Sequence, residues 1–159
     1  MRIRHLPPVV FAAVVLAALS FADALSAEGH ASYQVENGIA VYLGVVPAAM
    51  IQGHPKGHPE QAMHGGLPRG RHAYHVMAAV FDATSGERIS DATIEARVAP
   101  LGLAGSTRVL ESMRIAETVT YGNYFAMPDP GRYRIVFSIN LPGADKPIVM
   151  EFAYVLASH

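Results

Sequence analysis

The sequence predicts an all-β fold, an antiparallel immunoglobulin-like β-sandwich of about seven strands with a long His-rich loop. Two observations lead to this prediction. Apolar and polar residues alternate along successive runs, as they do along half-buried strands, and clusters of Gly, Pro, Asp and Ser separate these runs. No convincing helical period interrupts the pattern. The chain has no cysteine, so packing alone must hold its core together.

Residues 1–24 are predicted to be a signal peptide, with cleavage as late as residue 27. Arg2 and Arg4 form a basic start, an apolar run at 9–19 follows, and Ala22-Asp23-Ala24 supplies an A-x-A cleavage sequence. The apolar run is short for a bilayer, which favours a signal peptide over the alternative of an uncleaved anchor. The mature protein is therefore expected in the periplasm.

The charge of the mature chain excludes two classes of partner. Of the 12 basic and 13 acidic residues of the chain, removal of Arg2, Arg4 and Asp23 leaves 10 and 12, a net charge of −2 with neutral histidines. A chain of this charge has no electrostatic footprint for nucleic acid or for an anionic membrane surface.

Each strand is expected from its own run of residues. Residues 25–37 are predicted to be a flexible leader, and residues 38–159 to form the β-sandwich domain. Alternation is clearest at 131–141, where Tyr133, Ile135 and Phe137 point one way. Residues 47–71 are rich in Pro and Gly and lack any period, so they are predicted to form a long loop. The predicted strands cover 38–46, 73–81, 93–99, 107–115, 121–127, 131–141 and 147–156.

No motif in the chain indicates catalysis. It contains no G-x-S-x-G, no H-E-x-x-H, no glycine-rich phosphate loop and no cysteine nucleophile. Glu95 and Glu111 are isolated on alternating runs and are interpreted as solvated charges. We therefore expect a protein that is not an enzyme.

Histidine and methionine give the main indication of function. Five of the eight histidines lie within residues 53–77, in GHPKGHPEQAMHGGLPRGRHAYHVM. Imidazole suits copper, zinc, iron and nickel, and a thioether adds a preference for Cu(I). Copper is thus the first expected metal and iron the second. The candidate ligands are His64, His72, His75 and Met113, with His54, His58 and Met77 as additional candidates.

Each of these residues also has a plainer interpretation. The HPKGHP segment is compatible with an extended, hydrated loop that binds nothing. Met77 and Met113 alternate with apolar residues, so both would ordinarily be assigned to a hydrophobic core.

Two segments of the chain, GIAVYLGVVPAAM and MRIAETVTYGNYFAMPDPGRYRIVFSINLPG, resemble the periplasmic high-affinity iron-transport proteins, which are copper-binding immunoglobulin-like domains. In that family a Met is followed seven residues later by a His that immediately precedes a Tyr-Gly sequence. Here Met113 and Tyr121-Gly122-Asn123 match, but Thr120 occupies the histidine place, and the family's H-x-E pair is absent. The stretch HVMAAVFDATSGERISDATIEARV has a weaker similarity to the YtkA-like periplasmic domains.

The resemblance implies capture of copper or ferrous iron in the periplasm and delivery to an inner-membrane permease. The histidine loop would then replace the missing His and Glu ligands. The alternative is a non-catalytic β-sandwich module for interaction or assembly that has lost the metal site, pairing with another chain by strand addition. A homodimer is compatible with either function.

Overall fold

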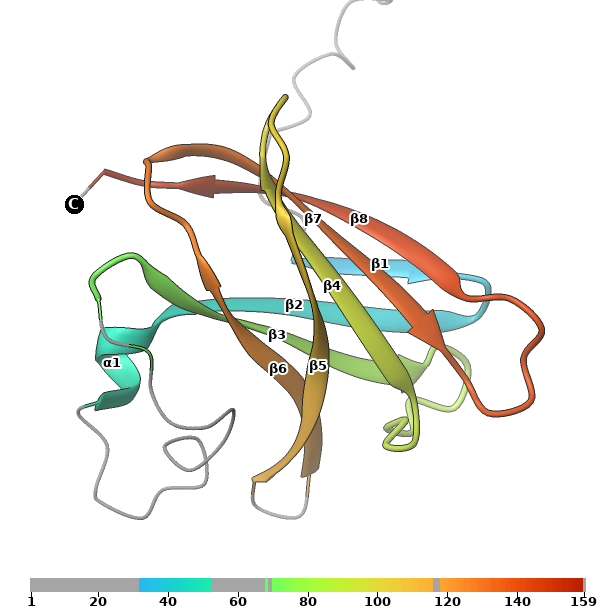
Figure 1. Cartoon of the computed structure of the whole chain (residues 1–159). Helices are drawn as coiled ribbons and strands as arrows, with labels where there is room; N and C mark the ends of the chain where they lie inside the picture. Colours follow the sequence, from blue (N-terminus) through green and yellow to red (C-terminus); the bar gives the residue numbers. More distant parts are fainter. Residues whose placement is uncertain (1–31, 53–67, 69, 116–117, 159) are drawn as a thin grey trace, which may run out of the picture.

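The computed structural model describes residues 32–52, 68, 70–115 and 118–158, and within them the chain is almost entirely β-structure (Figure 1). The predicted signal peptide and the histidines at positions 54, 58 and 64 lie outside the described residues. The elements are β1 (Tyr33–Glu36), β2 (Ile39–Pro47), α1 (Ala48–Gln52), β3 (Ala73–Asp82), β4 (Thr93–Pro100), β5 (Ser106–Ile115), β6 (Thr118–Ala126), β7 (Gly131–Asn140) and β8 (Ile148–Leu156).

The strands form one antiparallel sheet in the order β1-β2-β3-β6-β5-β4-β7-β8. Strand β5 carries the sheet around a corner, because residues 106–110 pair with β4 while residues 111–115 pair with β6. The two edge strands approach each other where Gln34 Nε2 in β1 donates a hydrogen bond of 2.6 Å to the carbonyl oxygen of Glu151 in β8. The sheet is therefore nearly closed into a barrel.

This architecture confirms the predicted all-β, antiparallel class. The finer prediction, an immunoglobulin-like sandwich of about seven strands, is not confirmed, because the eight described strands follow one another in a single sheet. Alternation along a strand predicts which of its faces is buried. It does not predict whether the strands form one continuous sheet or two separate sheets.

The predicted leader and loop both contain regular structure. Tyr33–Glu36, which the sequence analysis places in a flexible leader, forms β1. A two-residue turn at Asn37-Gly38, with φ of 49° and 77°, joins β1 to β2. Asn-Gly is the preferred sequence for a hairpin turn that needs positive φ at both residues. Pro47 ends β2, and Ala48–Gln52 forms the short helix α1 at the start of the predicted loop.

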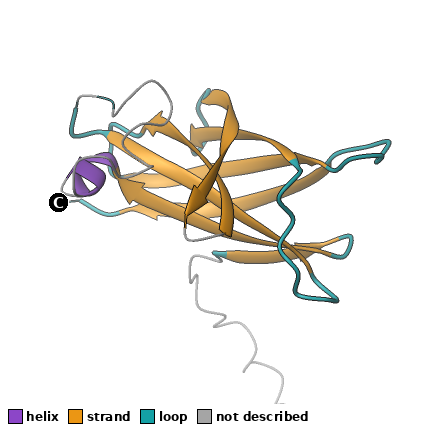
Figure 2. Cartoon of the chain, turned by 90° about the horizontal axis from the view of Figure 1, so that it is seen from below, coloured by secondary structure: helices purple, strands orange, loops and turns teal. Residues whose placement is uncertain are grey.

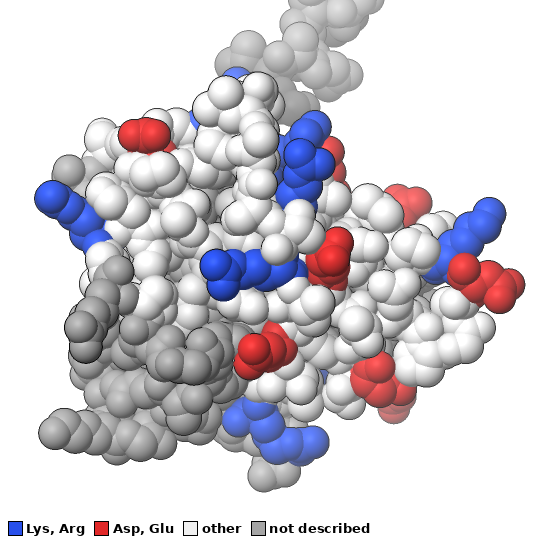
Figure 3. Space-filling model, viewed as in Figure 1, with Lys and Arg blue, Asp and Glu red and all other residues white. Residues whose placement is uncertain are grey.

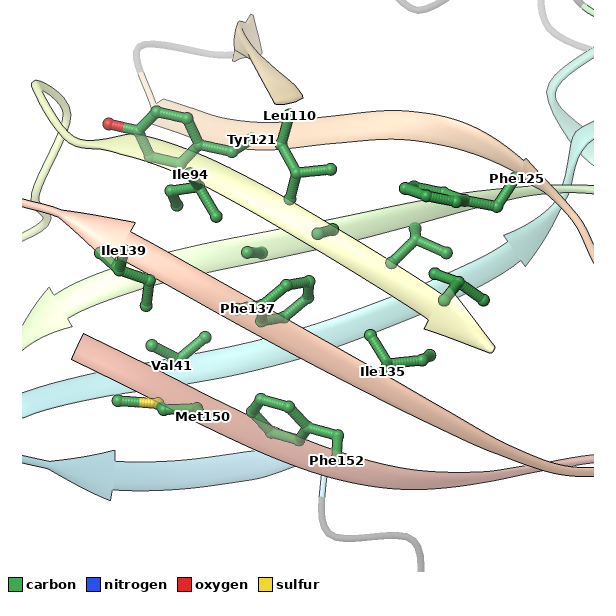
Figure 4. Packing of buried hydrophobic residues seen from close by; sticks show 14 of the residues in the cluster. Val41, Ile94, Leu110, Tyr121, Phe125, Ile135, Phe137, Ile139, Met150 and Phe152 are labelled. Carbon is green, nitrogen blue, oxygen red and sulfur yellow. The ribbon is translucent and has the colours of Figure 1, made fainter. Parts of the chain in front are cut away.

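Inward-facing residues of both halves of the sheet meet in one hydrophobic core (Figure 4). In β7 the alternation predicted from the sequence is observed, with Tyr133, Ile135, Phe137 and Ile139 all buried. Phe137 packs against Phe152 of β8 with ring centroids 5.5 Å apart. From the other half, β2, β3 and β6 contribute a further set of buried side chains: Ile39, Val41, Tyr74, Val76, Ala78, Val80, Val119, Tyr121 and Phe125.

The surface in view shows no large area of one charge. Acidic and basic side chains are interspersed singly across this face of the molecule (Figure 3). Among the described residues, no helix is both long and apolar enough to cross a membrane. Helix α1 lies at the same end of the molecule as the C-terminus in both cartoon views (Figures 1 and 2).

Candidate metal centre

Three of the candidate ligands, His75, Met77 and Met113, lie on the outer face of the sheet, the face turned away from the core. In β3, Tyr74, Val76 and Ala78 point into the core, so His75 and Met77 point to the opposite side. His75 and Met77, two residues apart in β3, therefore share one face of the strand. Paired residues of antiparallel strands point to the same face. The cross-strand partners therefore share this outer face: Tyr124 opposite His75, Gly122 opposite Met77 and Glu111, and Thr120 opposite Met113.

His75 and Met113 converge above Gly122. A Cβ atom built on Gly122 would lie 2.6 Å from His75 Nε2 and 3.0 Å from the terminal methyl carbon of Met113. The missing side chain of the middle strand, β6, thus leaves the space in which residues from β3 and β5 meet. Met113 belongs to no hydrophobic core cluster of the described residues, although its alternation favoured a core position.

The imidazole of His75 is enclosed by its surroundings. His75 has 0% relative exposure and is the one buried polar or charged residue among those described; Met113 has 1%. The ring of Tyr124 lies against the imidazole, with centroids 4.8 Å apart and an interplanar angle of 31°. Tyr124 in turn packs against Ala48, the first residue of α1. Burial of an imidazole costs more free energy than burial of an apolar side chain, so its presence here favours a functional role.

Met77 occupies the same face but leans toward another glycine. A Cβ atom on Gly44, its partner in β2, would lie 3.1 Å from the terminal methyl carbon of Met77. The three atoms nearest to a Cβ on Gly122 belong to His75 and Met113 and not to Met77. Met77 is thus paired with Gly122 in the sheet, but its terminal methyl group lies near the Cβ position of Gly44.

Thr120 occupies the position at which the resembled family has a histidine, and it lies beside the positively charged side chain of Arg88. Arg88 Nη1 donates hydrogen bonds to the carbonyl oxygen of Val119, at 2.6 Å, and to Thr120 Oγ1, at 3.3 Å. The guanidinium carbon of Arg88 also lies 4.4 Å from the centre of the Phe81 ring. A fixed positive charge disfavours a metal cation beside Thr120, so this side of Met113 is poorly suited to bind one.

The remaining sequence candidates are not brought to this pair. His72 is exposed just before β3, where its carbonyl oxygen accepts a hydrogen bond from Met127 N at 2.8 Å. Its side chain lines a hollow together with Arg108, Tyr124 and Ala126. The candidates His54, His58 and His64 lie outside the described residues. Within the described part of the chain, no three His, Cys, Asp or Glu side chains are grouped closely enough to bind a metal.

Sequence reasoning did not identify Gly122 or Tyr124 as part of this site. The Tyr-Gly-Asn-Tyr segment was noticed only for its spacing from Met113, and a glycine inside a strand is a signal of close approach by another group. Glu111 was interpreted as a solvated charge. It is exposed, but it lies directly opposite Gly122 in the sheet.

The chemistry of the two converging side chains fits copper better than ferrous iron. A thioether is a soft donor that selects Cu(I), and imidazole binds copper in both oxidation states. Each nitrogen donor must be unprotonated to bind. His75 Nε2 and Met113, held by two strands over an open glycine, could thus supply two donors to a copper ion.

Comparison with solved structures shows the same fold in copper-bound proteins. A copper-bound glutamate-to-glutamine variant of FetP from uropathogenic Escherichia coli strain F11 matches with a TM-score of 0.60 and 16% identity, over 80% of this chain and 95% of that one. A copper-bound methionine-to-isoleucine variant of Campylobacter jejuni P19 matches with a TM-score of 0.58 and 14% identity, over 77% and 92%. The resemblance found in the sequence is confirmed for the fold.

The fold also occurs outside these copper-bound proteins. A DUF4426 family protein from Pseudomonas aeruginosa PAO1 matches with a TM-score of 0.57 and 14% identity, over 78% of this chain and 92% of that one. No protein-family model matches the chain, and no curated protein matches it. The similarity to YtkA-like domains stays a prediction.

Proposed function

We propose that this protein is a periplasmic metal-binding protein that captures copper and carries it to a membrane transporter. The observation that supports this most directly is the convergence of His75 Nε2 and Met113 above Gly122. The fold supports it as well, since solved structures of copper-bound variants of FetP and P19 have the same fold. The predicted signal peptide would place the protein in the periplasm, and an inner-membrane permease is the proposed recipient.

The proposed ligands indicate which metal the site should prefer. His75 and Met113 are the proposed ligands from the described residues, and His64 and His72 are proposed as further nitrogen donors. Copper is the first metal because a thioether contributes little to binding of a harder ion, and ferrous iron is the second. Met77, His54 and His58 are proposed to assist capture rather than to form the centre.

The test is a metal titration of the exported protein, purified without a polyhistidine tag. Cu(I), Cu(II), Fe(II) and Zn(II) would be added under anaerobic control, and stoichiometry and affinity measured by calorimetry. We expect one tight equivalent of copper. His75→Phe retains an aromatic ring against Tyr124 but removes both nitrogens, so it should lower copper affinity at least about tenfold. His159→Ala, which removes a histidine that is not among the proposed ligands, is the matched control for loss of a histidine.

A second function, a non-catalytic module for interaction or assembly, is favoured by one observation. Arg88 is hydrogen-bonded to Thr120, where the resembled family has a ligand. A protein of this kind would bind a protein partner stoichiometrically in metal-free buffer. Weak copper binding at several sites, unchanged in His75→Phe, would reject the copper proposal in favour of this one.

A further inference from the structure

We propose that Glu111 is a third, carboxylate donor of the copper site and that it controls affinity for Cu(II). This inference rests on the proposed copper-binding function. His75 and Met113 are sufficient to bind Cu(I), whereas tight binding of Cu(II) also requires the carboxylate oxygen of Glu111.

The position of Glu111 follows from the register of β5 and β6. Glu111 is paired with Gly122, the residue above which His75 and Met113 converge. Directly opposed residues of an antiparallel pair have Cβ positions about 4.5–5.5 Å apart. A glutamate side chain is long enough to cover that distance, and Gly122 has no side chain to obstruct it. Glu111 also precedes Met113 by two residues, so both point to the same face of β5.

The other side of Met113 cannot provide this donor. Thr120, paired with Met113, is hydrogen-bonded to the guanidinium group of Arg88 at 3.3 Å. A cation approaching there would meet a positive charge, whereas at Glu111 it would meet a carboxylate. Of these two sides of Met113, the side toward Glu111 is thus the more favourable for a cation.

Exposure adds a route for the ion. His75 and Met113 are buried, but Glu111 is exposed on the same face. A carboxylate at the solvent side of two buried donors attracts a cation and can bind it first. Glu111 therefore combines an accessible position with a donor atom within reach of the buried pair.

The hardness of the donor atoms determines which oxidation state of copper should need Glu111 for binding. Thioether sulfur favours Cu(I), and nitrogen and oxygen donors in a tetragonal arrangement favour Cu(II). Removal of the carboxylate should leave the nitrogen and sulfur donors for Cu(I) while depriving Cu(II) of its oxygen. The two oxidation states should therefore respond differently to a single substitution at Glu111.

The experiment compares the exported protein with Glu111→Gln and with Glu151→Gln, which removes an exposed carboxylate from β8 in the other half of the sheet. Cu(II) affinity is measured by calorimetry and Cu(I) affinity by competition with a chromogenic chelator. For Glu111→Gln we expect Cu(II) affinity to fall at least about tenfold, Cu(I) affinity to change less than about twofold, and the Cu(II) electron paramagnetic resonance spectrum to change. Glu151→Gln should match the parent in all three.

The possible outcomes distinguish failure of this inference from failure of the proposed copper-binding function. If Glu111→Gln binds Cu(II) as the parent does, with an unchanged spectrum, Glu111 is no ligand, although copper binding through His75 can still hold. Equal losses of Cu(I) and Cu(II) affinity in Glu111→Gln would show that Glu111 is not specific to Cu(II), and would overturn this inference. If the parent itself binds neither ion tightly, the proposed function fails.

Discussion

His75 and Met113 lie on strands that are not neighbours, yet their side chains meet above one residue of the strand between them. Measured from a Cβ position on Gly122, Nε2 of His75 is at 2.6 Å and the methyl carbon of Met113 at 3.0 Å, so the two atoms are at most about 5.6 Å apart, the total of these distances. A side chain on β6 would separate β3 from β5 on this face. The absence of a side chain at Gly122 therefore lets these two side chains converge.

Replacement of Gly122 by alanine should damage the site. A Cβ atom 2.6 Å from His75 Nε2 forces the buried imidazole to move, and overpacking of this kind costs about 1–3 kcal/mol. We expect copper affinity to fall at least about tenfold, measured by calorimetry, together with a lower urea midpoint. Gly44→Ala is the matched control, since the added Cβ meets only Met77, with the flexible end of that side chain nearest, at 3.1 Å. Equal loss of copper affinity in both variants would contradict the role given to Gly122.

The two methionines should differ in their effect on copper. Met113→Leu conserves volume, so we expect it to cost less than about 1.5 kcal/mol of stability while copper affinity falls at least about tenfold. Met77→Leu should leave copper affinity nearly unchanged, because the Met77 methyl group leans toward Gly44. Parallel Cu(I) titrations of the two variants test this. A larger loss for Met77→Leu would place the sulfur ligand on β3 instead of β5.

Tyr121 should contribute to stability through its hydroxyl group. Its Oη accepts a hydrogen bond from Ala92 N at 3.0 Å and donates one to the carbonyl oxygen of Ile89 at 3.4 Å. Burial is the main cause that raises the pKa of this phenol. Tyr121→Phe should lower the free energy of unfolding by about 1–2 kcal/mol, because it leaves the Ala92 amide without this acceptor. Tyr42→Phe, at an exposed position, is the control in the same urea denaturation experiment and should have little effect.

The turn after β3 should make stability sensitive to acid. Asp82 Oδ1 accepts hydrogen bonds from Ser85 N at 2.7 Å and Thr84 N at 2.9 Å. The bond from Ser85 is the larger of the causes that lower the Asp82 pKa from 3.8. A lowered folded-state pKa means that this stabilisation is present above pH 3.8 and is lost as the pH falls through the lowered value.

Thermal denaturation of Asp82→Ala against pH measures this contribution. The variant should be less stable than the parent at neutral pH, and the difference should shrink as the pH falls below 3.8. Asp82→Asn keeps an oxygen acceptor without a charge, so its stability relative to Asp82→Ala should stay constant across that range. A parent-to-alanine difference that is constant down to strong acid would refute the assignment.

Much of the fold could be predicted because the relevant signals are local. Alternation located the seven predicted strands, and β7 buries the residues whose period indicated burial. The first strand was missed because its four residues are too few to establish a period, although Asn37-Gly38 is a strong hairpin signal. For the site, composition identified His75, Met77 and Met113 as candidates. It did not distinguish them from core residues, because alternation is the same on both faces of a strand.

The amino-acid sequence was sufficient to predict the class of fold, the strand segments and the soft donor atoms available for a metal. Which of those donors converge depends on how the strands are arranged in the folded protein. The order β3-β6-β5 brings together segments that are distant along the chain, and the register places Gly122 between Met77 and Glu111. Strand order and register depend on the burial of whole faces of the sheet, so no local pattern contains them. The convergence of His75 and Met113 above Gly122 is a consequence of that long-range pairing.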